Sequence, residues 1–337
     1  MADWQTLSLP QHKGVPGWEF TELRNFDLAS FPKAGPGESA YPAVVFEDPP
    51  ADAIRLSQVD SAFARVEPAT AEGPLVMPLS QAVEEHGELV DRYLGTVVPV
   101  EDDPFVARNA AEWEGGLFVY VPRNVKIDAP VIASAVQAQP GAALNWRVLV
   151  VLEEGAEAEV WEEYLSTADG LFTTVVELVV GENASLRFVS AQDLDEKSLI
   201  FGTQRARVAR DGSLDWVVLG FGSANGKVFQ NTILDGEGAS GKVTGAYATR
   251  GRQHLDFDTT QEHAAANCTS DLAFRGILGA RSSAVWRGMI KVDPGAQQTD
   301  AFQESRNLLL SKKAHADAIP GLEILANDVR CTHAAAI

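Results

Sequence analysis

The stretch that decides the fold runs from Gly141 to Asn183 and reads GAALNWRVLVVLEEGAEAEVWEEYLSTADGLFTTVVELVVGEN. Runs rich in valine, leucine and aromatic residues are separated here by short turn sequences, EGA around Gly155 and ADG around Asp169. Within a run, apolar residues recur at every second position, as at Leu149 and Val151. This alternation is typical of β-strands, whose side chains point to opposite faces in turn.

The same spacing of turns continues for about two hundred residues, and good helix signals are absent from this part of the sequence. Consecutive turn centres lie 13–15 residues apart, which suits one strand and one turn repeated many times. The turn centres are Gly141, Gly155, Asp169, Asn183, Lys197, Gly212, Asn225, Gly238, Arg252, Asn267, Arg281 and Gly295.

A repeat of this length is compatible with two architectures. An antiparallel meander would close as a barrel or a sandwich. A parallel β-helix would use two units, roughly 28 residues, for each coil and would form two flat sheets. Twelve long strands are many for a small barrel, so the pattern slightly favours the β-helix.

The region before the repeat has a different texture. Residues 1–113 read as a mixed α/β, partly helical segment, and residues 114–333 as the β-helix core. Helical spacing of apolar residues predicts a helix over Leu79–Leu94. A second helix is predicted to open at Asp103-Pro104, because proline suits the first helical position. A short strand is predicted over Ala43–Phe46.

The composition excludes several classes of function. The 337 residues include 27 Lys and Arg against 47 Asp and Glu, a net charge of -20, which repels nucleic acid and anionic membrane surfaces. The longest apolar runs are too short to span a bilayer. The opening MADWQTLSLPQHKG lacks the pattern of a signal peptide, and two cysteines provide no disulfide framework. We therefore expect a cytoplasmic protein.

Two polar motifs are assigned structural roles. Gly236–Val243 (GEGASGKV) contains both GxGxxG and GxxxxGK, but a β-branched segment follows where a phosphate loop needs a helix. We predict turn glycines there rather than a nucleotide site. The paired carboxylates Glu153-Glu154 and Glu162-Glu163 are interpreted as parts of acidic surface runs.

A possible metal site lies in the strand that follows. His254, Asp256 and Asp258 alternate, so a strand would place all three on one face, with His263 nearby. Carboxylate and imidazole groups bind metals. The favoured interpretation is a solvated polar strand face, and the metal site is the alternative.

The third candidate site is Cys331-Thr332-His333. The stretch Leu322–His333 reads as extended, so Cys331 and His333 would present a thiol and an imidazole side by side. Sulfur with imidazole suits zinc, copper or iron in a cluster. Two ligands cannot complete a four-ligand site, so a metal or cluster would be transient or shared with another chain. The alternative is a buried structural cysteine beside a hydrogen-bonded histidine.

Several blocks together resemble the SufB/SufD family of iron–sulfur cluster assembly scaffolds, and SufD more than SufB. Gly17–Phe26 (GWEFTELRNF) is similar to the family segment W-x-[FY]-T-x-L-R, and Asn109–Val131 to the beginning of its β-helix. Lys291–His333 is the most specific block. It is similar to the SufD patterns A-Q-x-T-D, R-N-L-L-L-S, P-x-L-E-I and D-V-[KR]-C-[ST]-H.

The resemblance implies a right-handed parallel β-helix flanked by helical segments, with residues 334–337 as the start of the C-terminal one. It implies a scaffold rather than an enzyme, pairing with a SufB-like subunit through the β-helix and binding a SufC-like ATPase that hydrolyses ATP. A nascent iron–sulfur cluster would be held transiently with SufB. His333 matches the SufD histidine at that interface and Cys331 the cysteine before it, whereas Ser305 stands where SufB has a sulfur-accepting cysteine.

Two departures and two alternatives accompany the resemblance. Ala334 follows His333 where the family has glycine, and the sequence stops at Ile337 where the family is expected to continue into a C-terminal helical segment that contacts SufC. A stand-alone β-helix enzyme acting on polysaccharide is one alternative, and a homodimeric structural protein without cluster chemistry is the other. Flavin binding is left open, because no dinucleotide fold is recognisable.

Overall fold

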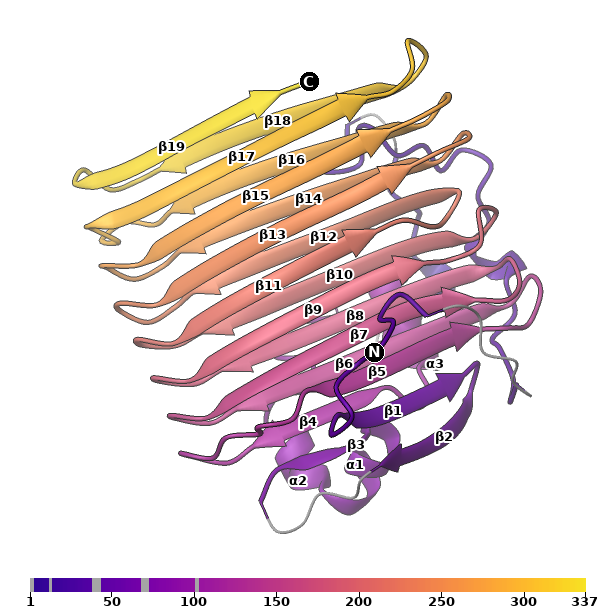
Figure 1. Cartoon of the computed structure of the whole chain (residues 1–337), viewed down its shortest axis with the longest axis horizontal. Coiled ribbons are helices and arrows are strands. Elements are labelled where there is room, and N and C mark those ends of the chain that lie inside the picture. The colour runs from indigo at the N-terminus through magenta and orange to yellow at the C-terminus, as the bar shows by residue number, and fades with distance from the viewer. Residues whose placement is uncertain (1–2, 12–13, 38–43, 68–72, 101–102) are drawn as a thin grey trace.

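The computed structural model describes residues 3–11, 14–37, 44–67, 73–100 and 103–337. Strands make up 52% of the chain and helices 8%. The strands wind into a parallel β-solenoid of about 8 turns, with two sheets and about 29 residues per coil (Figure 1). The prediction of a mainly β, two-sheet parallel β-helix is confirmed.

Each coil contributes one strand to each sheet, so the two sheets alternate along the chain. The ten-stranded sheet consists, in spatial order, of β19 (Val329–Ala336), β17 (Thr299–Leu309), β15 (Thr269–Leu278), β13 (Ser240–Thr249), β11 (Ser213–Gly220), β9 (Ser185–Asp193), β7 (Glu157–Ser166), β5 (Val131–Gln137), β1 (Ile54–Val59) and β2 (Ala62–Glu67). The nine-stranded sheet consists of β18 (His315–Ile324), β16 (Ser283–Val292), β14 (His254–His263), β12 (Asn225–Leu234), β10 (Leu199–Val208), β8 (Leu171–Val180), β6 (Ala143–Leu152), β4 (Leu117–Val121) and β3 (Leu75–Pro78).

Neighbouring strands pair in parallel and in register, except that β1–β2 and β3–β4 are antiparallel at the N-terminal end of the stack. Because strand side chains alternate, each coil sends every second residue into the interior. The inward rows are mainly apolar and include the fully buried Trp146, Trp216 and Trp286. This continuous core stabilises the solenoid, since no coil could bury its apolar face alone.

The turns between strands lie close to the predicted centres. Gly141, Gly155, Asn183, Gly238, Asn267 and Gly295 have the positive φ angles that favour glycine and asparagine. Four centres are displaced, because the left-handed residue lies one or two positions before the predicted one. These left-handed residues are Asp211, Ser223, Gly251 and Ala280, where the sequence suggested Gly212, Asn225, Arg252 and Arg281.

The predicted helices form, with one interruption. Instead of one helix over Leu79–Leu94, α1 (Leu79–Glu85) and α2 (Gly87–Val90) are separated at His86, whose φ of -132° and ψ of 33° are not helical. α3 (Pro104–Glu112) begins as predicted, because the Asp103 carboxylate accepts hydrogen bonds from the first turn. Two short 3-10 helices are η1 (Trp4–Thr6) and η2 (Leu28–Ser30). Residues 44–46 form no strand, and Ala43 lies outside the described residues.

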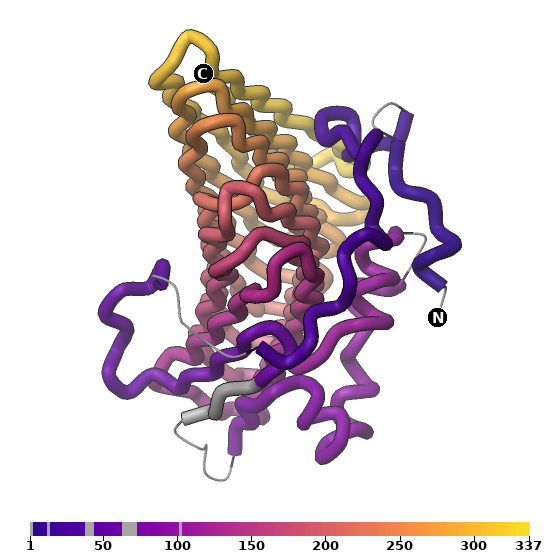
Figure 2. The backbone as a smooth tube through the Cα atoms, turned by 90° about the vertical axis from the view of Figure 1, so that its right-hand side faces the viewer, coloured from indigo at the N-terminus to yellow at the C-terminus, as the bar shows by residue number. Residues whose placement is uncertain are grey.

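Some of the N-terminal residues form strands of the solenoid, and others pack on its outer face. β1 and β3 extend the two sheets, whereas α3 and residues 14–37 lie along the outer face of the nine-stranded sheet (Figure 2). Trp18 packs there against Phe105 and Phe229. Residues 334–336, where a helical segment was expected to start, instead continue β19, because they pair in register with β17.

The two outer faces therefore differ. The nine-stranded sheet is covered over several coils by the N-terminal segment, whereas the ten-stranded sheet is open from β9 to β19 (Figure 1). In the part of the chain that the structure describes, no helix is long and apolar enough to cross a membrane.

Candidate functional site

Cys331 and His333 lie in β19, the edge strand of the ten-stranded sheet. They are in register with Ala301 and Gln303 of β17, both of which are buried in the interior. Cys331 and His333 therefore belong to the inward-facing rows, as their spacing of two residues predicts. His333 is nevertheless exposed and Cys331 half-buried, because β19 belongs to the last coil of the stack.

The surroundings of the pair are apolar on one side. Cys331 and Val329 pack against a buried cluster that includes Ile290, Val292 and Ala301. Close by in sequence, Leu322, Ile324 and Leu325 at the end of β18 are exposed. Among the described residues, β19 pairs only with β17, so one edge of its backbone is unpaired. Such an edge can accept a further strand from another chain.

The chemistry of the thiol follows from its position. The pKa of Cys331 is raised above its ordinary value. Burial of the thiol is the larger cause, and the nearby negative charge of Asp300 is the smaller one. The protonated thiol is therefore favoured at neutral pH, whereas the thiolate is the form that binds metals. A metal that binds Cys331 has to displace this proton.

Two polar residues of β17 lie in the interior beside the pair: Gln303 is in register with His333, and Ser305 is the next inward-facing residue. Gln303 is fully buried, and its Nε2 donates a hydrogen bond to the carbonyl of Gly321 at 2.8 Å. Ser305 is also buried and accepts from Asn307 Nδ2 at 3.3 Å. The Ser305 side chain therefore lies inside the coil and not on its surface.

The alternating residues of β14 share a face, as predicted, but the face is not solvated. Asp256 accepts hydrogen bonds from Lys227 Nζ at 2.8 Å and from Thr21 Oγ1 at 2.7 Å. Asp258 lies 3.7 Å from the same Lys227. The N-terminal segment covers this ion cluster. The favoured interpretation of a solvated strand face is therefore wrong for Asp256, because a segment more than two hundred residues away packs over it.

His263 lies on the opposite, inward face of the same strand. Its Nε2 is 2.8 Å from Ser270 Oγ, and burial lowers its pKa to about 4. His254 and His263 therefore cannot join one ligand set. Among the described residues, no group of three or more His, Cys, Asp or Glu side chains is arranged to hold a metal ion.

The glycine-rich motif is a turn, as predicted. Gly236–Val243 connects β12 to β13, so that a strand and not a helix follows it. Gly238 has a φ of +75°, and a Cβ at Gly236 would clash with the backbone of Arg210. Glycine is needed here for close packing between coils rather than for phosphate binding.

The carboxylates Glu162 and Glu163 were expected on the surface, and both are buried. Glu162 points into the solenoid, where Trp146 Nε1 donates to it at 3.0 Å and the Tyr164 hydroxyl also donates. Burial raises the pKa of Glu162 to about 7. Glu163 points outward and accepts from Ser134 Oγ at 2.7 Å and from the Val45 amide at 2.9 Å.

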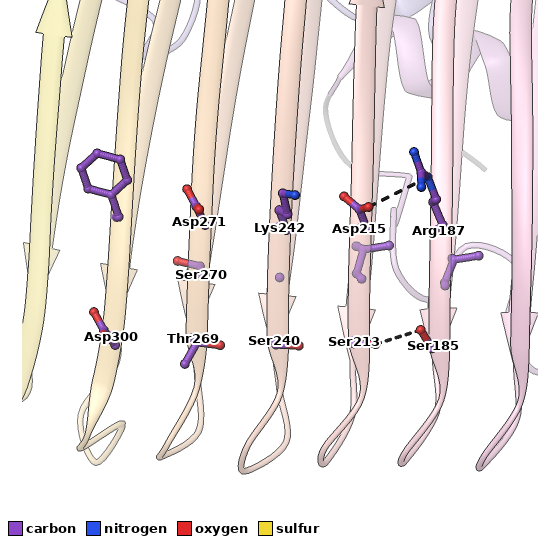
Figure 3. A pocket seen from close by; sticks show the side chains of 14 residues that line it. Ser185, Arg187, Ser213, Asp215, Ser240, Lys242, Thr269, Ser270, Asp271 and Asp300 are labelled. Carbon is purple, nitrogen blue, oxygen red and sulfur yellow. Dashed lines mark hydrogen bonds and ion pairs between the residues drawn. The ribbon is translucent and has the colours of Figure 1, made fainter.

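A surface depression of about 600 Å³ lies on the ten-stranded sheet (Figure 3). One row of its lining carries four hydroxyls and ends at Asp300, with Ser213 Oγ 3.0 Å from Ser185 Oγ. In the next row, positive and negative side chains alternate from coil to coil, as Arg187, Asp215, Lys242 and Asp271 do. Opposite charges on adjacent strands stabilise a sheet face. The carboxylates of this row are thus placed beside cations.

The fold and the open last coil define a two-sheet parallel β-solenoid protein with an imidazole and a thiol on its terminal edge strand. A family model for the SufBD core domain of SUF system iron–sulfur cluster assembly matches residues 134–337, and a model for the SufBD N-terminal region matches residues 54–132. The chain belongs to the SufBD family of iron–sulfur cluster assembly proteins.

Individual relatives agree with this assignment. The chain is 32% identical to the iron–sulfur cluster assembly protein SufD of Bacillus subtilis (strain 168), over 79% of this chain and 62% of that protein. It is 29% identical to an iron–sulfur cluster assembly SufBD family protein of Staphylococcus aureus (strain USA300), over 79% of this chain and 58% of the relative. The alignments thus cover less than two thirds of each relative's length.

Proposed function

We propose that this chain is a non-enzymatic, SufD-like scaffold subunit of a SufB–SufC–SufD complex. In this proposal, His333 and Cys331 contribute ligands to a nascent iron–sulfur cluster at a seam shared with a SufB-like subunit. The observation that carries the proposal is the position of the pair: an exposed imidazole and a half-buried thiol lie on β19, whose backbone has one unpaired edge among the described residues. A pair enclosed within the protomer could not serve a shared site.

The ligand chemistry explains why a partner is required. A cluster iron takes thiolate or imidazole ligands, and cluster sites are completed by about four such groups. His333 and Cys331 supply two, so a partner has to supply the remainder. The cluster is cargo that is assembled and passed on. Its arrival would release the proton that the raised pKa keeps on Cys331.

The fold offers a way to bring a partner to this place. A strand from a SufB-like subunit could pair with the free edge of β19, while apolar side chains pack on Leu322, Ile324 and Leu325. Binding of a SufC-like ATPase, and a cytoplasmic location, are proposed from the family resemblance.

Anaerobic reconstitution with a SufB-like subunit and a SufC-like ATPase tests the proposal. Cluster formation is followed by absorbance and Mössbauer spectroscopy. We expect His333→Ala to abolish most cluster formation and Cys331→Ser to reduce it. The matched control is His315→Ala, since His315 is 70% exposed and lies at the start of β18. Assembly by His333→Ala at the rate of the unsubstituted protein would reject the assigned role.

Sedimentation velocity distinguishes the scaffold proposal from the homodimeric alternative, because it measures which complexes the chain forms. The scaffold proposal predicts a complex with the SufB-like subunit that weakens when Leu322 and Ile324 are replaced by serine. A dimer of this chain that persists in the presence of the SufB-like subunit would instead support the structural protein without cluster chemistry.

A further inference from the structure

The block Arg306–Lys313 has no part in the proposed cluster site, although it belongs to the most specific part of the family resemblance. Near the end of β17, Arg306 and Leu308 are exposed and alternate with the inward-facing Ser305 and Asn307, so they lie on the outer face of the ten-stranded sheet. They are in register with Arg275 and Ile277 of β15. Two arginines and two aliphatic side chains thus form adjacent rows on one surface.

The aliphatic part of this surface is unusually exposed. Ile277 is 47%, Leu308 57% and Leu310 67% exposed. The next strand of the sheet, β13, carries Ala246 and Ala248 in the corresponding rows. Because alanines border the patch, the larger side chains project above the neighbouring strand. Exposed aliphatic side chains in a cluster are typical of protein interaction sites.

The turns beside the patch are positively charged. Arg252 follows β13, Arg281 follows β15, and Lys312 and Lys313 follow β17. These turns stack on one another, since the Arg281 amide donates to the Gly251 carbonyl at 2.9 Å. All four side chains belong to exposed residues, and within the described ranges none of them forms an ion pair.

The opposite ends of the same strands are acidic. The turns there carry Asp235, Glu237, Asp293 and Asp328. Within the patch, the carboxylate of Glu304 is shared by Arg275 and Arg306, so one negative charge faces two positive ones. On a chain with a net charge of -20, the last three coils therefore have one strongly basic edge.

We propose that the surface formed by Arg275, Ile277, Arg306, Leu308, Leu310, Lys312 and Lys313, called here the basic–apolar patch, binds an acidic segment of a partner protein. Carboxylates of the segment would meet the cations, and apolar side chains between them would pack on the leucines. This inference goes beyond the proposed cluster site and does not depend on it.

A protein segment fits this surface better than a membrane does. Charges act over a Debye length of about 8 Å at physiological ionic strength, so a narrow acidic segment senses the local basic edge. An anionic bilayer is much wider than the patch and would also face the acidic turns at the opposite ends of the same strands. The aliphatic side chains also lie between cations, an arrangement that matches a segment with an ordered pattern.

The order of the patch along the strand defines that pattern. Arginines come first, then the Ile277–Leu308 row, then Leu310, then the lysines of the turn. Successive outward residues of a strand are about 7 Å apart. A helix repeats one face about every 6 Å, at four-residue spacing. A helix with Glu, Leu, Leu and Glu at successive four-residue intervals would match the patch.

The probe is therefore a labelled helical peptide with this Glu–Leu–Leu–Glu pattern, and the comparison peptide has lysine in place of both glutamates. Fluorescence anisotropy measures the affinity of each for the full chain. We expect the acidic peptide to bind at least tenfold more tightly than the lysine peptide, with a difference that shrinks as salt rises.

The variants separate the two halves of the patch. Leu308→Ser with Leu310→Ser should weaken the acidic peptide by about tenfold. Lys312→Glu with Lys313→Glu should weaken it similarly and should improve binding of the lysine peptide. The control for the leucines is Val83→Ser, at an exposed position of α1. The control for the lysines is Arg24→Glu with Arg123→Glu, which changes the net charge by the same amount as the double lysine variant, at exposed sites outside the patch. Controls should leave both affinities unchanged.

Three results would overturn the proposal. The first is equal binding of the two peptides, or affinities that the patch variants leave unchanged. The second is patch-dependent sedimentation with phosphatidylserine vesicles in the absence of peptide binding, which would assign the patch to a membrane surface. The third is patch-dependent dimers of the chain alone, which would assign it to a second copy.

Discussion

Gln303 of β17 and His333 of β19 are in register, yet Gln303 is fully buried and His333 is exposed. The difference in exposure comes from the position of the two strands in the solenoid and not from the side chains themselves. β19 lies next to β17 and covers Gln303, whereas no described strand covers β19. The same inward row is therefore core at one coil and accessible surface at the next. This is where a repeating fold can offer polar ligands to a partner without disturbing its own interior.

This difference predicts opposite consequences for two substitutions. His333→Ala should leave the free energy of unfolding within about 0.5 kcal/mol of the original value, because the residue is exposed. Gln303→Ala should cost about 1–3 kcal/mol, because it removes a buried side chain and its hydrogen bond to Gly321. Urea unfolding followed by circular dichroism measures both. A large loss in His333→Ala would show that the residue is structural, and its effect on cluster assembly could not then be interpreted.

The fold was accessible from the sequence because solenoid turns repeat at nearly constant spacing. Glycine and asparagine mark the left-handed positions at Gly155, Asn183 and Gly238, and these agree with the structure. The displaced centres have a local cause. At Ala280 and Ser223 the left-handed residue is neither glycine nor asparagine, so composition alone pointed to a neighbour. The sequence also contains no sign of the interruption at His86, since apolar residues keep helical spacing on both sides of it.

The candidate site was accessible to a smaller extent. Alternation correctly placed Cys331 and His333 on one face, since that depends only on strand geometry. It could not distinguish the solvated from the covered outer face, so Asp256 was misjudged because residues 14–37 lie far away in the sequence. Glu162 and Glu163 were misjudged for another reason. Acidic runs are usually exposed, and only the three-dimensional partners Trp146, Tyr164 and Ser134 make their burial possible.

The thiol of Cys331 provides a second prediction. Its pKa is raised by burial and by the negative charge of Asp300, so its alkylation by iodoacetamide should still increase with pH above 9. Asp300→Asn removes the charge and should lower the pKa, which increases the rate at pH 8 by about twofold to fivefold. Mass spectrometry of the peptide that contains Cys331 gives the rate. Cys268 is buried and should not react in the folded protein.

Asp271→Asn is the control for this experiment, since Asp271 lies on the outer face of β15 and is not among the charges that affect Cys331. It should leave the alkylation rate unchanged. An equal increase in both variants would point to the net charge of the protein rather than to Asp300.

The buried pair of Lys227 and Asp256 predicts how firmly the N-terminal segment is held. Lys227→Met would leave the Asp256 carboxylate buried, with the Thr21 hydroxyl as its remaining hydrogen-bond donor among the described residues, at a cost of about 3–5 kcal/mol. Adding Asp256→Asn should recover much of this loss, because it removes the fully buried charge, while Asp258 still faces Arg287 at 3.9 Å. Urea unfolding measures the cost, and limited proteolysis of residues 14–37 reports whether the segment detaches.

A matched exposed pair is the control for the buried one. Arg207 and Asp235 form an ion pair in which both side chains are more than 40% exposed. Arg207→Met should cost less than about 1 kcal/mol, because solvent screens an exposed pair. A cost for Lys227→Met as small as this would mean that the N-terminal segment is not fastened by the ion cluster.

Glu162 predicts how stability depends on pH. Its pKa is about 7 in the folded protein, above the value of about 4.3 expected in an unfolded chain. Between these values the folded state binds more protons than the unfolded state, so this group lowers stability as pH rises from about 4.5 to 7 and has a constant effect above that. Glu162→Gln keeps an acceptor for Trp146 Nε1 and removes the charge. The variant should therefore be more stable at pH 8 by about 1–3 kcal/mol and should lose the pH dependence that comes from this residue.

Urea unfolding from pH 5 to pH 8 measures both curves, and Glu154→Gln at an exposed position is the control, expected to follow the original protein. If the Glu162→Gln and original curves run parallel over this range, the carboxyl of Glu162 does not take up a proton on folding.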